Sequence, residues 1–194
     1  MSREKRLLLG LLLLLAIPGL ILLVRDLFHA DPDDVVARAR VWHPIVARAA
    51  ERFDLDPALI LGVIAVESKG DPDARGRAGE RGLMQLMPAT AIEQAGFLGF
   101  EHPDDVDLFD PETNITLGAA YLREQMHRFS RPSLALAAYN AGPARLQSWL
   151  DGSPDLDPDE VLKTKAFPGT RSYVSLVLGY RNLIAARFER RPTR

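Results

Sequence analysis

The chain has 194 residues and a mass of 21.5 kDa, which suits one domain of ordinary size and a short additional segment. Apolar residues make up 47% and charged residues 26%, so the composition excludes a largely disordered chain. The formal net charge of −2 is not that of a nucleic-acid-binding protein, and we expect no nucleic acid partner. The absence of cysteine excludes disulfides and thiol catalysis, and the four histidines lack the spacing of metal ligands, so we expect no metal site.

The first 30 residues differ from the rest of the chain. Three basic residues near the N-terminus precede an uncharged apolar stretch at residues 7–24, which Arg25 closes. At a helical rise of 1.5 Å per residue this stretch would span about 27 Å, close to the roughly 30 Å of a hydrocarbon core. Basic residues before such a stretch favour a cytoplasmic N-terminus. We therefore expect residues 1–30 to form the cytoplasmic N-terminus and a membrane anchor. Residues 31–194 would then form one domain on the opposite side of the membrane.

A cleaved signal peptide is the alternative for this segment. Pro18-Gly19 could break the apolar helix and shorten it, which favours this alternative. The small-residue pattern that a signal peptidase needs is missing before Ala30, however, because Phe28 stands at one of its positions.

The rest of the chain is predicted to be all-α, because no segment alternates like a half-buried strand and helix-starting and helix-ending residues recur. The predicted helices lie at residues 35–53 with a break at His43-Pro44, at 57–68, at 88–96, at 111–129, at 133–141 and at 144–150, followed by a loop at 151–159 and a last helix capped by Thr170.

Glu67 stands out because it is a carboxylate at a position predicted to be buried. Ile60, Val63 and Ile64 form an apolar stripe on the helix at residues 57–68. Glu67 follows Val63 by four residues and Ile64 by three, which places it on the same helix face. Ionisation is unfavourable on such a face, so its pKa should be raised. The simpler alternative is that Glu67 swings into solvent at the helix end or pairs with an arginine.

Gln85 interrupts an otherwise apolar run at residues 83–87. A lone buried amide can bond both a hydroxyl and an N-acetyl group, as recognition of a sugar requires. The neighbouring Met84 and Met87 are, taken alone, more typical of core filling than of ligand binding.

Tyr139 and Asn140 end a predicted helix directly before Gly142-Pro143. Tyrosine offers a hydroxyl and a stacking face to a sugar ring, and asparagine offers a donor and an acceptor. A tyrosine anchored in the core and an asparagine that caps the helix are the structural alternatives.

Four groups of residues occur in order beyond the apolar segment. They are Glu67-Ser68 with Asp71-Pro72, Ala74, Gly79 and the run from Gly82 to Pro88; Asn114-Ile115 with Gly118 and Tyr121-Leu122; Ala138-Tyr139-Asn140-Ala141-Gly142-Pro143; and Thr170-Arg171 with Tyr173-Val174. In this order and spacing, over roughly residues 43–185, the chain resembles the soluble-lytic-transglycosylase-like (SLT) domain of the goose-type-lysozyme-like superfamily. The resemblance implies a lysozyme-like globular helical domain that cleaves peptidoglycan glycan strands.

The resemblance also implies roles for single residues. Glu67 would be the single catalytic acid/base. The positions that match the sugar-binding groove are Gln85, Met87 and Tyr139, with Asn140 and Tyr173 as neighbouring groove positions. Gly76 and Gly169 depart from the family pattern, which often has serine and glutamate there, both thought to help hold saccharide.

A single carboxylate suffices for glycan cleavage if the substrate supplies the nucleophile, whereas ordinary glycosidases need two. The expected reaction breaks the β-1,4 bond between N-acetylmuramic acid (MurNAc) and N-acetylglucosamine (GlcNAc). It leaves 1,6-anhydro-MurNAc ends and needs no cofactor. A lysozyme-type hydrolase on the same fold is one alternative, with Asp71, Asp73 or Glu80 positioning water. A non-catalytic glycan-binding envelope subunit is the other. The expected location is a bacterial inner membrane, spanned once, with the catalytic domain in the periplasm.

Overall fold

The computed structural model describes residues 31–189. Its helices are α2 (Pro32–Arg40), α3 (His43–Phe53), α4 (Pro57–Glu67), α5 (Pro88–Phe97), the 3-10 helix η1 (Pro103–Asp105), α6 (Pro111–Phe129), α7 (Pro132–Ala141), α8 (Pro143–Asp151), α9 (Pro158–Lys165) and α10 (Pro168–Glu189). The predicted membrane anchor at residues 1–30 lies outside the described residues. Among the residues that are described, no helix is long and apolar enough to cross a membrane.

The prediction of an all-α fold is confirmed for residues 31–189. Extended pairing in this part of the chain is limited to two isolated bridges, Arg75 with Arg81 and Arg81 with Leu86. Proline stands at the first or second position of most of these helices, where its fixed φ suits the helix and its missing N–H would have had no partner. Aspartate supplies the cap at three starts: the carboxylates of Asp56, Asp110 and Asp157 each accept a hydrogen bond from a first-turn backbone N–H.

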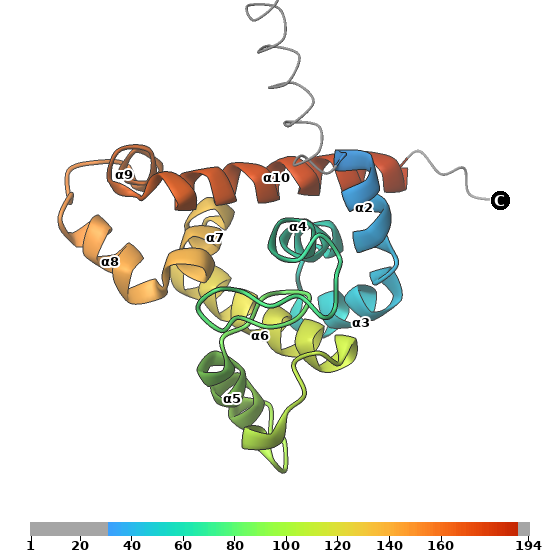
Figure 1. Ribbon diagram of the computed structural model, residues 1–194. Helices are drawn as coiled ribbons and strands as arrows, with labels where there is room; N and C mark the ends of the chain where they lie inside the picture. Colours follow the sequence, from blue (N-terminus) through green and yellow to red (C-terminus); the bar gives the residue numbers. More distant parts are fainter. Residues whose placement is uncertain (1–30, 190–194) are drawn as a thin grey trace, which may run out of the picture. The chain divides into compact units, whose positions relative to one another are not determined.

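Helix α4 is buried on every side, so the predicted apolar stripe describes only part of it. All residues from Ala58 to Ala65 are buried, because α10 and α3 both pack against this helix (Figure 1). Gly62 permits a close approach to α10, since a Cβ there would lie 2.8 Å from the carbonyl oxygen of Val177. A second link holds the start of α4: Arg181 Nε donates to Asp56 Oδ2 at 2.6 Å.

Two predicted boundaries near the C-terminus are wrong. The loop predicted at residues 151–159 ends earlier than expected, because α9 begins at Pro158, and α9 itself is absent from the prediction. The last helix begins at Pro168, so Thr170 lies inside its first turn and does not cap it. The Thr170 hydroxyl instead donates to Asn140 Oδ1 at 2.9 Å, which joins α10 to the end of α7.

Candidate active site

Glu67 is the last residue of α4, and its side chain is only partly exposed. Burial raises the pKa of its carboxyl from an ordinary value of 4.5 to about 7. The nearby Glu80 carboxylate adds to this rise, and the Tyr173 hydroxyl opposes it. The prediction that Glu67 sits in an apolar setting with a raised pKa therefore agrees with the structure, and the alternative of a solvated carboxylate does not.

Two tyrosines close the site around Glu67, one from α10 and one from α7. The hydroxyl of Tyr173 is buried and lies close enough to the Glu67 carboxyl to lower its pKa. It makes no hydrogen bond of good geometry within residues 31–189, so its contact with Glu67 is a loose one. Tyr139 lies near both groups, and burial beside Glu67 raises its own pKa well above the usual value. Its ring packs on Tyr121 with the ring centres 5.1 Å apart.

The Tyr139 hydroxyl already has a partner in the structure. It donates to the backbone carbonyl of Met84 at 2.9 Å, in the loop that carries Gln85. Because its one proton is used there, the oxygen is left to accept from an N–H or O–H of a substrate. The sequence predicted a hydroxyl available to a sugar ring; in the structure this hydroxyl also holds the loop at Met84.

Residues 81–86 are held in place by Asn114 of α6, a motif residue to which the sequence assigned no role. Its side chain is buried and donates to the carbonyls of Arg81 and Leu108, both at 2.9 Å, while it accepts from Met84 N–H at 2.8 Å. Gly82 has a φ of +75°, and a Cβ there would overlap Asn114. The segment that leads to Gln85 is therefore fixed by contacts from a distant helix.

Gln85 is half-buried and has a left-handed backbone, with a φ of +47°. Its amide nitrogen donates to the carbonyls of Ala74 at 3.0 Å and Gly82 at 2.8 Å. The side-chain N–H groups of Gln85 are therefore used to hold the loop, and only its amide oxygen is available to accept a hydrogen bond from a ligand. Met87, two residues further on, is 41% exposed, whereas Met84 is buried as core filling predicts.

The loop carboxylate of Glu80, one of three that the hydrolase alternative offers, lies close enough to Glu67 to raise its pKa. The backbone pairs Gly76 N–H with Glu80 carbonyl at 2.8 Å, which folds residues 76–80 into a tight turn. The Glu80 carboxylate accepts from Ala78 N–H at 3.0 Å and fills the place where a side chain at position 76 would lie. The Glu80 carboxylate can therefore take this position only because residue 76 has no side chain.

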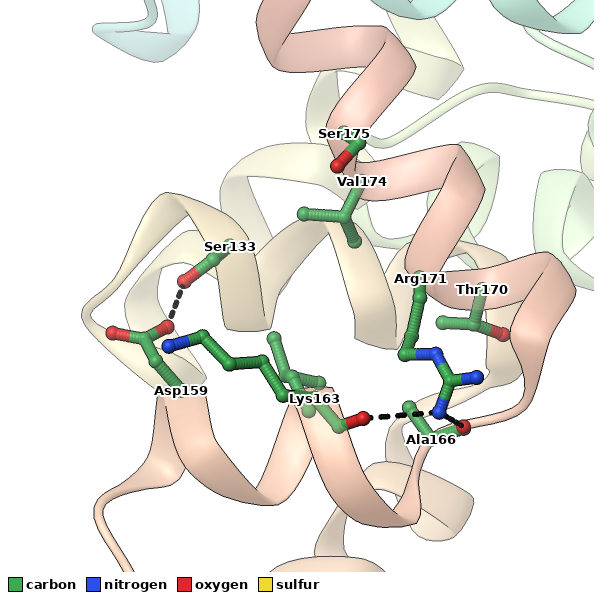
Figure 2. Close-up of a pocket in the computed structure, with 9 residues that line it drawn as sticks. Ser133, Asp159, Lys163, Ala166, Thr170, Arg171, Val174 and Ser175 are labelled. Carbon is green, nitrogen blue, oxygen red and sulfur yellow. Dashed lines mark hydrogen bonds between the residues drawn. The ribbon is translucent and has the colours of Figure 1, made fainter.

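Residues 170–171, in the first turn of α10, join this helix to the ends of α7 and α9. Arg171 reaches from α10 to the end of α9 and donates to the carbonyls of Lys163 at 3.0 Å and Ala166 at 3.2 Å (Figure 2). These contacts satisfy carbonyls at a helix end, which is a structural role. The small pocket that Arg171 lines, between α9 and α10, is shown in Figure 2.

A groove of about 520 Å³ runs past the site on the side of α7, α8 and α10. Val66, which precedes Glu67, and the buried Tyr173 both line it, and so does the exposed Asn140. The structure thus gathers Glu67, Tyr139 and Tyr173 at one point and places Asn140 beside them. In residues 31–189 no three His, Asp or Glu side chains are arranged to hold a metal ion.

A model of the family named the transglycosylase SLT domain matches residues 44–162. The chain belongs to this family. Its fold is the all-helical, lysozyme-like fold of SLT domains: the structure of an inactive mutant of the lytic transglycosylase Slt from Pseudomonas aeruginosa superposes with a TM-score of 0.71 at 36% identity, covering 77% of this chain and 25% of that one.

Two relatives show how the SLT domain is used in longer proteins. The soluble lytic murein transglycosylase of Escherichia coli K12 is 34% identical over 144 residues, which cover 72% of this chain and 22% of the relative. The endo-type membrane-bound lytic murein transglycosylase A of Klebsiella pneumoniae (strain 342) is 41% identical over 96 residues, which cover 47% of this chain and 46% of the relative. The chain therefore spans less than half the length of either relative.

Proposed function

We propose that this chain is a peptidoglycan lytic transglycosylase that breaks the β-1,4 bond between MurNAc and GlcNAc. The observation that carries the proposal is the carboxyl of Glu67, buried beside the groove of an SLT domain, with its pKa raised to about 7. A carboxyl with this pKa is partly protonated near neutral pH, so it can give a proton in one step and take one in the next. The relatives named above are lytic murein transglycosylases.

The reaction that we propose uses groups of the substrate as nucleophiles. Glu67 donates its proton to the glycosidic oxygen, the bond from that oxygen to the MurNAc anomeric carbon breaks, and the N-acetyl oxygen attacks the same carbon. The Glu67 carboxylate then accepts the proton of the MurNAc C6 hydroxyl, whose oxygen attacks the anomeric carbon and displaces the N-acetyl oxygen. The 1,6-anhydro ring forms and Glu67 is protonated again. The second attack is intramolecular, so its effective concentration exceeds that of water in a closed groove.

The residues around Glu67 support both steps. Tyr173 stabilises the carboxylate form that follows the first proton transfer, because its hydroxyl can donate to that carboxylate. The free acceptor oxygens of Tyr139 and Gln85 suit the N–H and hydroxyl donors of the sugar. We propose that Asn140, in the groove, and the exposed Met87 contact the sugars on either side of the broken bond.

A lysozyme-type hydrolase remains the alternative that a specific observation favours. Glu80 places a second carboxylate near Glu67, where it could orient a water molecule. A glycan-binding subunit without catalysis is the third function to be distinguished.

Mass spectrometry of sacculi digested with the full chain separates the three functions. We expect 1,6-anhydro-MurNAc ends, which are lighter by one water than reducing ends. Reducing ends would instead identify a hydrolase, and strands that bind the chain but stay intact would identify a glycan-binding subunit.

The pH dependence of cleavage gives a second test, because the first step needs protonated Glu67. We expect kcat/KM to fall as the pH rises through about 7. Glu80→Gln removes a cause that raises the pKa of Glu67, so the fall should move to lower pH. Tyr173→Phe removes a cause that lowers this pKa, so the fall should move to higher pH. Asp71→Asn, in the same loop, is the control and should leave the profile in place. If the pH at which kcat/KM falls moved in the same direction in Glu80→Gln and Tyr173→Phe, these two roles would be contradicted.

We propose that residues 7–24 anchor the protein in a bacterial inner membrane, with the catalytic domain in the periplasm. The length and charge pattern of that segment support this, and relatives named as membrane-bound are consistent with it. Cell fractionation should find the full-length protein with the membranes. A soluble mature form that begins near Ala30 would identify a cleaved signal peptide instead.

A further inference from the structure

The groove beside Glu67 has a single charged side chain in its lining. Val66 and Tyr173 line it next to the catalytic carboxyl, and Arg145 of α8 and Phe167 line it as well. The remaining lining residues are apolar or neutral, and Gly169 adds no side chain, although a Cβ there would meet nothing within 4 Å. The charge of the groove is therefore positive and is provided by one guanidinium.

Arg145 is supported by aromatic rings and lacks an acidic partner. Its guanidinium lies over the Phe167 ring, 5.5 Å from the ring centre, and Trp149 meets the same ring edge-on with the centres 5.4 Å apart. Phe167 is 52% exposed, so this platform faces the solvent. In the described part of the chain, no carboxylate forms an ion pair with Arg145 and no acceptor is hydrogen-bonded to it. Its position in the first turn of α8 adds to the positive end of that helix.

Three other cations on this side of the molecule, Arg131, Lys163 and Arg171, have partners within the fold. Arg131 binds Asp157 at 3.0 Å and Asp159 at 2.8 Å, and Arg171 is bonded to two carbonyls at the end of α9 (Figure 2). Lys163 pairs with Glu160 at 2.6 Å. The pocket between α9 and α10 thus offers no free charge, whereas Arg145 keeps all of its donors for a ligand.

We infer that Arg145, held over the Phe167 ring, binds a carboxylate of the peptide stem carried by the MurNAc residue in the groove. This inference rests on the proposed peptidoglycan substrate. The N-acetylated sugar backbone of that substrate is uncharged, since the lactyl carboxyl of MurNAc is joined to the peptide as an amide. The free carboxylates of the strand belong to the stems. A guanidinium fork binds a carboxylate through two parallel hydrogen bonds, so the chain discriminates strands that carry stems from strands that lack them.

The test compares two substrates. One is glycan strands with intact stems, and the other is the same strands after an amidase has removed the stems and the lactyl carboxyls that this frees have been converted to neutral methylamides. Arg145→Gln should lower kcat/KM on stem-bearing strands about tenfold, through a higher KM with kcat unchanged, because one charge-assisted contact is lost. On stem-free strands Arg145→Gln should match the wild type. Arg145→Lys keeps the charge and loses the fork, and should fall between the two. Arg128→Gln is the matched control, because Arg128 is also exposed over a phenylalanine ring, 5.4 Å from the centre of Phe129.

Binding provides a readout that does not depend on cleavage. In the full chain carrying Glu67→Gln, affinity for stem-bearing strands should exceed affinity for stem-free strands, and adding Arg145→Gln should remove most of this difference. An equal loss on both substrates, or no loss on either, would overturn the assignment of Arg145. The proposed function fails separately, if the wild type releases reducing ends or cleaves neither substrate, and the binding comparison still decides the role of Arg145.

Discussion

Replacing Glu67 with glutamine should reduce cleavage of glycan strands by about 10²- to 10⁴-fold, the range that a positioned general acid contributes. Glutamine has nearly the same shape and keeps a hydrogen-bond acceptor for Tyr173, but it can neither give a proton to the glycosidic oxygen nor take one from the C6 hydroxyl. Both chemical steps are therefore affected, while the groove is left in place. The measurement is the rate at which anhydro ends appear, with binding of strands as the check that the groove is intact.

The same variant should be more stable than the wild type above neutral pH, which separates loss of chemistry from loss of fold. The pKa of Glu67 rises from 4.5, its ordinary value, to about 7 in the fold, so between these values the folded protein binds more protons than the unfolded chain. Stability then falls as the pH rises through this window. At 1.36 kcal/mol per pH unit the effect at pH 8 is at most about 3 kcal/mol, reduced by the partial exposure of the carboxyl.

Thermal unfolding of Glu67→Gln should thus give a higher Tm than the wild type at pH 8 and a similar Tm at pH 4. Glu51→Gln, at an exposed position on α3, makes the same chemical change and should alter neither Tm nor activity. Near-wild-type cleavage by Glu67→Gln would falsify the assignment of the acid/base. A lower Tm at pH 8 would show that the Glu67 carboxylate is stabilised by the fold.

The helix starts could be predicted because their signal is local, and α9 shows where this stops. Asp56-Pro57 and Asp110-Pro111 correctly predict the starts of α4 and α6, and the same pair at Asp157-Pro158 begins α9. In the last case the pair lies in a stretch rich in proline and aspartate, and α9 has only 8 residues, too few to show a helical period. Arg171 of α10 bonds the carbonyls at the C-terminal end of α9. Such a contact between two helices leaves no pattern in the sequence of α9.

The site could be predicted in part for the same reason. Glu67 could be found because it follows apolar neighbours by three and four residues, although burial of Ala58 to Ala65 extends well beyond that one face. The left-handed backbone of Gln85 and its bonds to Ala74 and Gly82 depend on how the loop closes. That closure comes from Asn114, 30 residues further along the chain from Met84, and no local pattern indicates such a contact.

Tyr139→Phe should lower turnover about ten- to hundredfold and also lower stability. The ring would stay packed on Tyr121, but the oxygen that we propose as an acceptor for a substrate donor would be lost. One such bond to a group that develops charge is worth about 1.5–3 kcal/mol, which corresponds to this range at 1.36 kcal/mol per decade. The loss of stability is expected because the same hydroxyl donates to the Met84 carbonyl at 2.9 Å.

The stability loss follows from the carbonyl that Tyr139→Phe leaves without a donor. Met84 is fully buried, and an unsatisfied buried acceptor costs about 1–3 kcal/mol. Chemical denaturation measures this loss, and turnover per folded molecule is then measured under conditions where both proteins are folded. Turnover restored to the wild-type value after this correction would limit Tyr139 to holding the loop. A loss of turnover that persists would place the Tyr139 oxygen among the groups that contact the substrate. The reason is that only folded molecules, in which the loop is in place, enter this comparison.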